Sequence, residues 1–219
     1  MPALDAVLFD NDGTLVDTHD LLLDSFRHAT KSVLGRTIAD ERLMAKVGQP
    51  LSVQMWDFTD DEAVHDELLR VYRAFNESVH DERISLFPGT REALESLRDA
   101  GFSLGVATSK MHPLAQRGLE VLGIAEFFDC IVGADDCVRH KPDPEPVILG
   151  ARLLGVEARR CAFVGDSPFD IQAGNAAGMH TAAVLWGMFD EDVLRVETPD
   201  VVCGCFDELA AHLIARRAC

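Results

Sequence analysis

The chain has 219 residues, 47% of them hydrophobic and 26% charged, and its formal net charge at pH 7 is -17. This length accommodates one core domain with or without a smaller inserted domain, and the composition is typical of a soluble globular protein. The negative charge argues against a nucleic-acid partner. No apolar run approaches the roughly 18 residues of a membrane span, so we expect no membrane partner and a cytoplasmic location.

The first predicted element is a buried strand at about residues 5 to 10. A polar group follows it directly, with Asp10 and Asp12 one residue apart and Gly13 and Thr14 behind them. Open α/β sheets bind ligands outside the carboxyl ends of their strands. The two carboxylates are therefore candidates for a functional site, and we expect one of them to be a nucleophile.

The next segment, to about residue 86, has a helical pattern. Apolar residues at helical spacing predict a first helix that Gly35 ends, a short helix from Asp40 to near Gly48, and a longer helix over about residues 62 to 79. Strand-like runs are missing from this stretch. We therefore expect residues 18–86 to form an all-helical insert.

From residue 87 onward, strands and helices alternate. We predict strands at 102–107, 130–132, 161–164, 181–185 and 201–202, and helices at 90–99, 113–123, 144–155 and 206–216, with a further helix that follows the segment 165–170 and ends at about residue 177. Repeated β-α units imply a parallel sheet covered on both faces. The predicted fold is thus α/β, a doubly wound parallel sheet of residues 1–17 and 87–219, with the helical insert between them.

Several of these strand ends carry groups suited to phosphate or metal binding. Besides Asp10 and Asp12, they are Thr108 with Ser109, Lys141, and Asp166 with Asp170. Clustered carboxylates need a counter-charge, and oxygen ligands favour a hard cation, so we expect Mg²⁺. The cation and a lysine together would attract a small anionic phosphate substrate despite the net charge of the chain.

In this order, the motifs Asp-x-Asp-Gly-Thr, Thr, Lys and Gly-Asp-Ser-x-x-Asp resemble those of the haloacid dehalogenase superfamily of phosphotransferases. The resemblance covers the whole chain and implies a Rossmann-like core with a small mobile helical cap. Within that superfamily the chain is similar to the branch of phosphoglycolate phosphatases and cap-containing inorganic pyrophosphatases. Mg²⁺-dependent hydrolysis of phosphoglycolate or pyrophosphate is the implied activity.

The resemblance implies a role for each motif residue. Asp10 would attack phosphorus and form an aspartyl-phosphate, and Asp12 would protonate the leaving oxygen and later activate water. Thr108 and the main-chain N–H of Ser109 would hold phosphate oxygens. Lys141 would neutralise the phosphate and Asp10 together.

The resemblance also implies the metal ligands and one cap contact. Asp166 would anchor Mg²⁺ with Asp10 and the main-chain carbonyl of Asp12, and Asp170 would be an auxiliary ligand. Gln49, in a Gly-x-Pro turn of the cap, would contact the leaving group. Asn11 departs from the usual hydrophobic residue between the two aspartates, and we expect it to adjust packing only.

Two other functions remain open. A phosphosugar mutase of the same superfamily usually has a histidine where this chain has Leu22. A receiver-type phospho-accepting signalling domain normally has its accepting aspartate on a later strand and no helical insert after the first. A monomer and a homodimer are both compatible with the sequence.

Some residues have simpler interpretations. Lys110 is interpreted as a solvated charge, His19 as a surface residue, and Tyr72 and Phe75 as core residues of the cap. The six cysteines contain no Cys-x-x-Cys pair, and we expect most of them to be small core residues in a reducing compartment.

Overall fold

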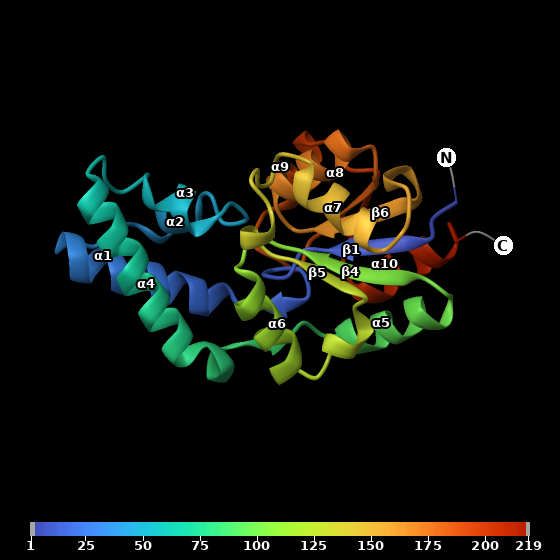
Figure 1. Ribbon diagram of the computed structural model, residues 1–219, viewed down its shortest axis with the longest axis horizontal. Helices are drawn as coiled ribbons and strands as arrows, with labels where there is room; N and C mark the ends of the chain where they lie inside the picture. The colour runs from blue at the N-terminus through green and yellow to red at the C-terminus, as the bar shows by residue number, and fades with distance from the viewer. Residues whose placement is uncertain (1–2, 218–219) are drawn as a thin grey trace.

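The computed structural model describes residues 3–217, which contain a six-stranded sheet of order β5-β4-β1-β6-β7-β8 (Figure 1). Its strands are β1 (Ala6–Phe9), β4 (Ser103–Ala107), β5 (Cys130–Val132), β6 (Cys161–Gly165), β7 (His180–Val184) and β8 (Val201–Cys203). All neighbouring strands in it pair in parallel. The predicted α/β class is confirmed.

Helices cover both faces of this sheet, and accordingly its central strand β1 is apolar and buried at every position. Val7 and Phe9 pack in one hydrophobic cluster with residues of α5 (Thr90–Asp99), α6 (His112–Val121) and α10 (Phe206–Ile214). Ala6 and Leu8 point to the other face, against α7 (Glu145–Leu153) and α8 (Pro168–Ala177). Side chains that alternate along β1 thus build two cores.

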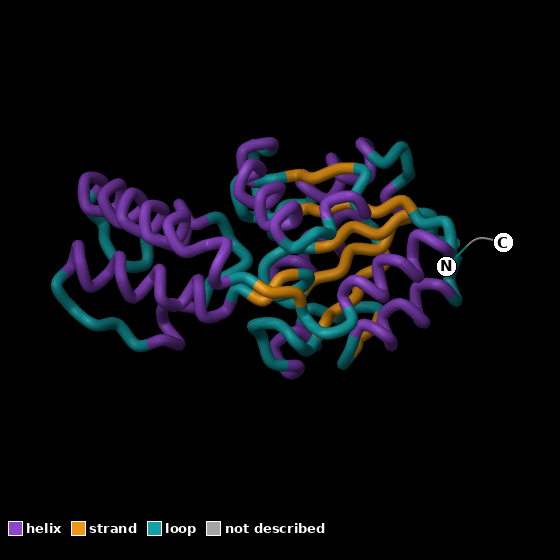
Figure 2. The backbone as a smooth tube through the Cα atoms, turned by 90° about the horizontal axis from the view of Figure 1, so that it is seen from below, coloured by secondary structure: helices purple, strands orange, loops and turns teal. Residues whose placement is uncertain are grey.

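Four helices form a separate group beside the sheet, which we call the cap (Figures 1 and 2). They are α1 (His19–Leu34), α2 (Asp40–Met44), α3 (Leu51–Met55) and α4 (Glu62–Arg83). The cap has its own hydrophobic core, in which the rings of Phe26 and Tyr72 lie 4.9 Å apart in an edge-to-face arrangement. The sheet and the helices packed on it are called the core domain below.

A small antiparallel ladder lies where the chain passes between the core domain and the cap. Strand β2 (Val16–Asp17) pairs with β3 (Ser85–Leu86), with Asp17 opposite Ser85. Two-residue strands give no periodic pattern, so this ladder could not be predicted from the sequence. The ladder stands at the two ends of the helical segment, and the domain boundaries at residues 18 and 86 remain a prediction.

The other elements lie close to their expected positions, with some differences. Helices α3 and α9 (Glu191–Val196) were not predicted, α2 ends at Met44 rather than near Gly48, and α4 is longer than expected. Gly35 ends α1 with a left-handed backbone, as predicted. Within residues 3–217, no helix is both long and apolar enough to cross a membrane.

The cysteines lie at several depths. Cys161 and Cys203 are buried, Cys130 and Cys137 are half-buried, and Cys205 is exposed. The sixth, Cys219, lies outside the described residues. The prediction that most of them are small core residues fits Cys161 and Cys203 best, and Cys205 is not one of these core residues.

Candidate active site

The predicted site residues converge at the carboxyl edge of the sheet. Asp10 follows β1, Thr108 follows β4 and Asp166 follows β6, and these three strands are neighbours. Lys141 approaches from the segment before α7. The side chains of all four are buried, so their charges interact at short range with little screening by water.

Lys141 is the counter-charge of two aspartates. Its Nζ lies 2.9 Å from Oδ1 of Asp10 and 2.5 Å from Oδ1 of Asp170. Burial by itself would lower the pKa of this lysine, but the two adjacent carboxylates raise it above its usual range. Lys141 therefore keeps its positive charge inside the protein.

Asp166 is fixed from several directions. Thr14 Oγ1 donates to its Oδ1 at 2.9 Å, and the main-chain N–H of Met188 donates to its Oδ2 at 2.8 Å. A side chain at Gly13, whose φ is +86°, or at Gly187 would collide with the carboxylate. The glycines thus leave the space that Asp166 occupies. Gly13 and Thr14 of the Asp-x-Asp-Gly-Thr motif therefore help to hold Asp166 of the Gly-Asp-Ser-x-x-Asp motif in place.

Asp10, Asp166 and Asp170 form a group that could hold a metal ion. One carboxylate oxygen from each lies within 4.8 Å of the others. Burial, opposed by Lys141, raises the pKa of Asp10 to about 7, and burial with the charge of Asp170 raises that of Asp166 to about 8. Lys141 alone does not balance three buried carboxylates, whereas a divalent cation with oxygen ligands fits this donor set.

Asp12 lies beside this group and has partners of its own. Lys110 Nζ is 2.8 Å from its Oδ1, and Asn11 Nδ2 donates to the same oxygen at 3.1 Å. The interpretation of Lys110 as a solvated charge is wrong, because its side chain is 7% exposed. Its place two residues after Thr108, at a strand end of the site, was the signal that the sequence offered.

The loop 48–50 of the cap rests on the core domain at the site. Ser109 Oγ donates a hydrogen bond to the main-chain carbonyl of Gly48. Gln54 Nε2 donates to the main-chain carbonyl of Gln49 at 2.7 Å and so supports the same loop. This places the predicted contact residue Gln49 over the carboxyl edge of the sheet.

A cavity of about 500 Å³ separates the cap from the strand ends. It brings together five of the predicted site residues on one lining, namely Asp10, Asp12, Gln49, Thr108 and Ser109. Lys141, Asp166 and Asp170 are not part of this lining, but they belong to the charged group that contains Asp10.

The cap supplies lining residues that the sequence analysis did not assign to a site. They include Leu22, Tyr72, Arg73 and Asn76. Tyr72 packs in the cap core as predicted and also lines the cavity, because its turn of α4 faces the core domain. His19 is on the surface, as interpreted, with its side chain 52% exposed.

Comparison with known proteins gives a consistent result. The family model described as haloacid dehalogenase-like hydrolase matches residues 7–184. The chain is 36% identical to pyrophosphatase PpaX of Bacillus velezensis over 195 residues, which cover 89% of each chain, and 34% identical to pyrophosphatase PpaX of Bacillus pumilus over 212 residues, which cover 95% of each. A solved structure described as a predicted phosphoglycolate phosphatase from Haemophilus somnus is 25% identical, with a TM-score of 0.88 over 97% of this chain and 99% of that one.

Proposed function

The chain belongs to the haloacid dehalogenase-like hydrolase family, and from this premise we propose that it is a Mg²⁺-dependent phosphatase that hydrolyses pyrophosphate through an aspartyl-phosphate on Asp10. One observation carries the proposal. Asp10 lies on the cavity wall and is at the same time in contact with Lys141 and part of the acidic group with Asp166 and Asp170. A carboxylate nucleophile needs both access to substrate and positive charge behind it.

The first half-reaction transfers a phosphoryl group to the protein. A carboxylate oxygen of Asp10 forms a bond to phosphorus while the bond from phosphorus to the leaving oxygen breaks. Asp12 donates a proton to that oxygen, so the leaving group departs in its protonated form. Lys141 neutralises charge on Asp10 and on the transferred phosphoryl group.

The second half-reaction restores the enzyme. Asp12, now ionised, removes a proton from a water molecule, whose oxygen attacks phosphorus and displaces Asp10. Thr108 and the main-chain N–H of Ser109 hold the phosphate oxygens during both steps. The products are inorganic phosphate and the free carboxylate of Asp10.

The divalent cation fits among these groups. Asp10, Asp166 and Asp170 would hold Mg²⁺ together with the main-chain carbonyl of Asp12. When bound, it supplies positive charge against the phosphate oxygens that become more negative as the bond to the leaving group weakens. In this proposal Asp170 is an auxiliary ligand, because Ser167 and Lys141 already occupy its two oxygens.

Asp12 also decides the reaction class. A superfamily member that attacks carbon lacks the second aspartate, whereas here Asp12 is present with Lys110 and Asn11 bound to it. Leu22 lines the cavity at the position where mutases of the superfamily carry a histidine. Both residues favour phosphate hydrolysis over dehalogenation and over sugar isomerisation.

Pyrophosphate is the first candidate substrate, because the pyrophosphatase relatives are 34–36% identical over most of this chain. Phosphoglycolate is the second candidate, since the structurally similar Haemophilus somnus protein carries that description. The test is phosphate release from pyrophosphate, phosphoglycolate and a panel of other phosphate compounds with Mg²⁺ present. Rapid turnover of pyrophosphate with little release from phosphoglycolate supports the proposal. The reverse result would make phosphoglycolate the substrate instead.

Two further measurements, of sugar phosphate isomers and of the lifetime of the phosphorylated protein, separate the remaining alternatives. Conversion of a hexose 1-phosphate to its isomer without net phosphate release would indicate a mutase. A phosphorylated protein that persists for many minutes would indicate a receiver-type switch. In the proposed mechanism, by contrast, water removes the phosphoryl group from Asp10 in each turnover.

A further inference from the structure

The charges on the cavity wall are unevenly partnered. The described lining contains the acidic residues Asp10, Asp12 and Glu77, the basic residues Lys110 and Arg73, and His140. Lys110 is paired with Asp12. Arg73 makes no ion pair or hydrogen bond with any other residue among positions 3–217. The cap therefore contributes a guanidinium group whose hydrogen-bond donors are free to bind a ligand.

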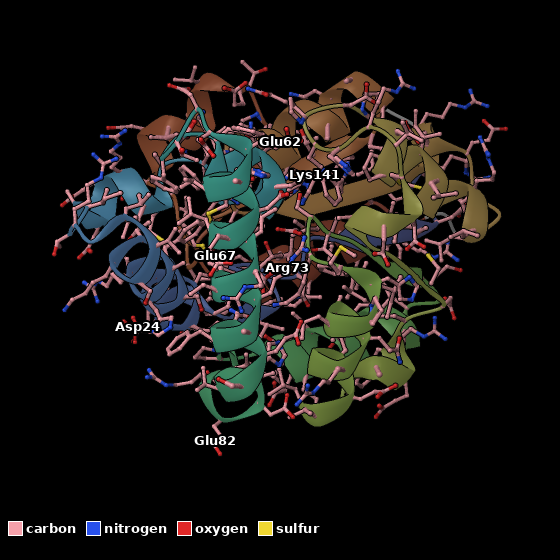
Figure 3. The ribbon with its side chains drawn as sticks, turned by 60° about the vertical axis from the view of Figure 1, so that its left-hand side comes forward. Asp24, Glu62, Glu67, Arg73, Glu82 and Lys141 are labelled. Carbon is pink, nitrogen blue, oxygen red and sulfur yellow. The ribbon has the colours of Figure 1, made fainter. Side chains whose placement is uncertain are left out.

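The position of Arg73 relates it to the proposed chemistry. It lies on α4 next to Tyr72 and one turn before Asn76, which line the same cavity. Figure 3 shows Arg73 on the side of α4 that is turned toward the core domain. Asp12, the group proposed to protonate the leaving oxygen, lines the cavity from the core side.

A leaving group with its own negative charge would be repelled by the carboxylates that line this cavity. It departs from Asp10 past Asp12, and Glu77 adds a further negative charge on the cap side. Lys141 is committed to Asp10 and Asp170, and Lys110 to Asp12. Arg73 is the remaining cation of the described lining, and a guanidinium binds phosphate or carboxylate oxygens through two parallel hydrogen bonds.

We propose that Arg73 is a specificity-determining residue that binds the anionic leaving group of the substrate. This inference rests on the proposed function and adds a substrate class to it, namely phosphate compounds whose leaving group carries a second phosphate or a carboxylate. Arg73 acts at the far end of the substrate. It takes no part in the bonds that form and break at Asp10.

The experiment compares two substrates in matched variants. Pyrophosphate has an anionic leaving group, whereas p-nitrophenyl phosphate has one that is uncharged before the bond breaks. In R73Q we expect the ratio of kcat/KM for pyrophosphate to kcat/KM for p-nitrophenyl phosphate to fall by roughly 10- to 100-fold, the range for a hydrogen bond to a charged group. R73K keeps the positive charge but cannot form the two parallel hydrogen bonds of a guanidinium, so it should recover part of this ratio.

The control is R70Q, one turn earlier on α4. Arg70 donates to Glu67 on the same helix and is not part of the described cavity lining. R70Q should keep the wild-type ratio, and phosphoglycolate as a third substrate shows whether Arg73 accepts a carboxylate as well as a phosphate. An unchanged ratio in R73Q, or an equal fall of the ratio in R70Q, would overturn the assignment.

A binding measurement keeps this test separate from the proposed function. In the D10N background, which cannot form the covalent intermediate, calorimetry with pyrophosphate should show weaker binding when R73Q is added and no change when R70Q is added. Equal affinity in all three proteins would overturn the role of Arg73. Wild-type protein that binds pyrophosphate through Arg73 but releases no phosphate from any compound would contradict the proposed function alone.

Discussion

The hydroxyl of Ser109 donates a 2.6 Å hydrogen bond to the main-chain carbonyl of Gly48, and this bond joins the core domain to the cap at the edge of the cavity. Ser109 follows the residue Thr108 that ends β4, and Gly48 lies in the loop before α3. The cap is thus seated on the strand ends, in the position that would keep bulk water away from the proposed phosphorylated intermediate.

The seating of Gly48 gives the first prediction. Its φ is +104°, and a Cβ there would lie 2.7 Å from Ser167 Oγ, so G48A should prevent the loop from reaching the core. We expect kcat/KM to fall by about tenfold or more, the effect of ~1.4 kcal/mol on closure. The control is G35A, which also has a left-handed backbone, with φ of +67°, but has nothing within 4 Å. Equal activity of the two variants would contradict this account.

The second prediction concerns the nucleophile. D10N replaces a carboxylate oxygen by an amide nitrogen of the same size, and Asp10 is buried, so the fold should persist while turnover falls to below ~0.1% of wild type. Phosphate release measures the loss, circular dichroism checks the fold, and mass spectrometry of acid-quenched protein checks for a covalent phosphate adduct. Wild-type turnover by D10N would eliminate the mechanism.

The third prediction concerns the metal. Chelation should abolish activity and Mg²⁺ should restore it. D166A should need over about tenfold more Mg²⁺ for half-maximal activity, because it removes one of the three grouped carboxylates. D192A removes an exposed carboxylate of α9 and should titrate like wild type. If D166A and wild type need the same Mg²⁺ concentration, Asp166 is not a ligand.

The fourth prediction concerns stability. K141M removes the counter-charge of Asp10 and Asp170 and leaves both carboxylates buried, so the free energy of unfolding should fall by roughly 3 kcal/mol. K46M breaks the exposed pair of Lys46 with Asp57 and should cost less than ~1 kcal/mol. Urea unfolding of the metal-free proteins measures both. A loss in K141M no larger than that in K46M would show that the pairing contributes little to stability.

The fifth prediction concerns the pH dependence of stability, and it involves His180, the first residue of β7. His180 lies with its Nε2 2.9 Å from that of His212, and burial, assisted by Arg216 and His212 and opposed by Asp200, lowers the pKa of His180 to about 4. The unfolded chain, with a histidine pKa near ~6.5, then binds more protons than the folded chain between these values. The contribution of His180 to stability should be complete above about pH 6.5 and decline toward pH 4, by about 2 kcal/mol at pH 5.

The substitution H180Q should flatten this decline. Urea unfolding at pH 7 and pH 5 measures it, with H19Q, at an exposed position, as the control that keeps the wild-type slope. A decline that is the same in H180Q and wild type would assign the pH dependence to other groups.

The parts of the site that could be predicted are those held by local chain geometry. Asp10, Thr108 and Asp166 each follow a strand directly, so the parallel arrangement of those strands brings them together without further information. The helices of eight or more residues were also predicted, some from apolar periodicity over several turns and others from proline and glycine residues at their ends, such as Pro113 and Gly123.

The parts that could not be predicted depend on contacts between distant segments. The place of Lys110 two residues after Thr108 puts it near the site, but its pairing with Asp12 depends on how β1 and β4 are arranged in the sheet. In the sequence Arg73 resembles the other charges on the polar face of a helix, and it reaches the cavity only when the cap is placed on the core domain. The β2–β3 ladder, which joins residues 16–17 to residues 85–86, is likewise set by the tertiary structure.

That ladder also makes the cap a segment that could be replaced by another, because it brings the two ends of the cap together. Asp17 and Ser85 stand directly opposite each other, so everything between them leaves and rejoins the core domain at adjacent points about 5 Å apart. A segment with neighbouring ends can be replaced by another of different length without moving the strands that carry Asp10 and Asp166. In the proposed function, in which a cap residue binds the leaving group, grafting at this junction would change substrate preference and leave Asp10 and Asp166 in place.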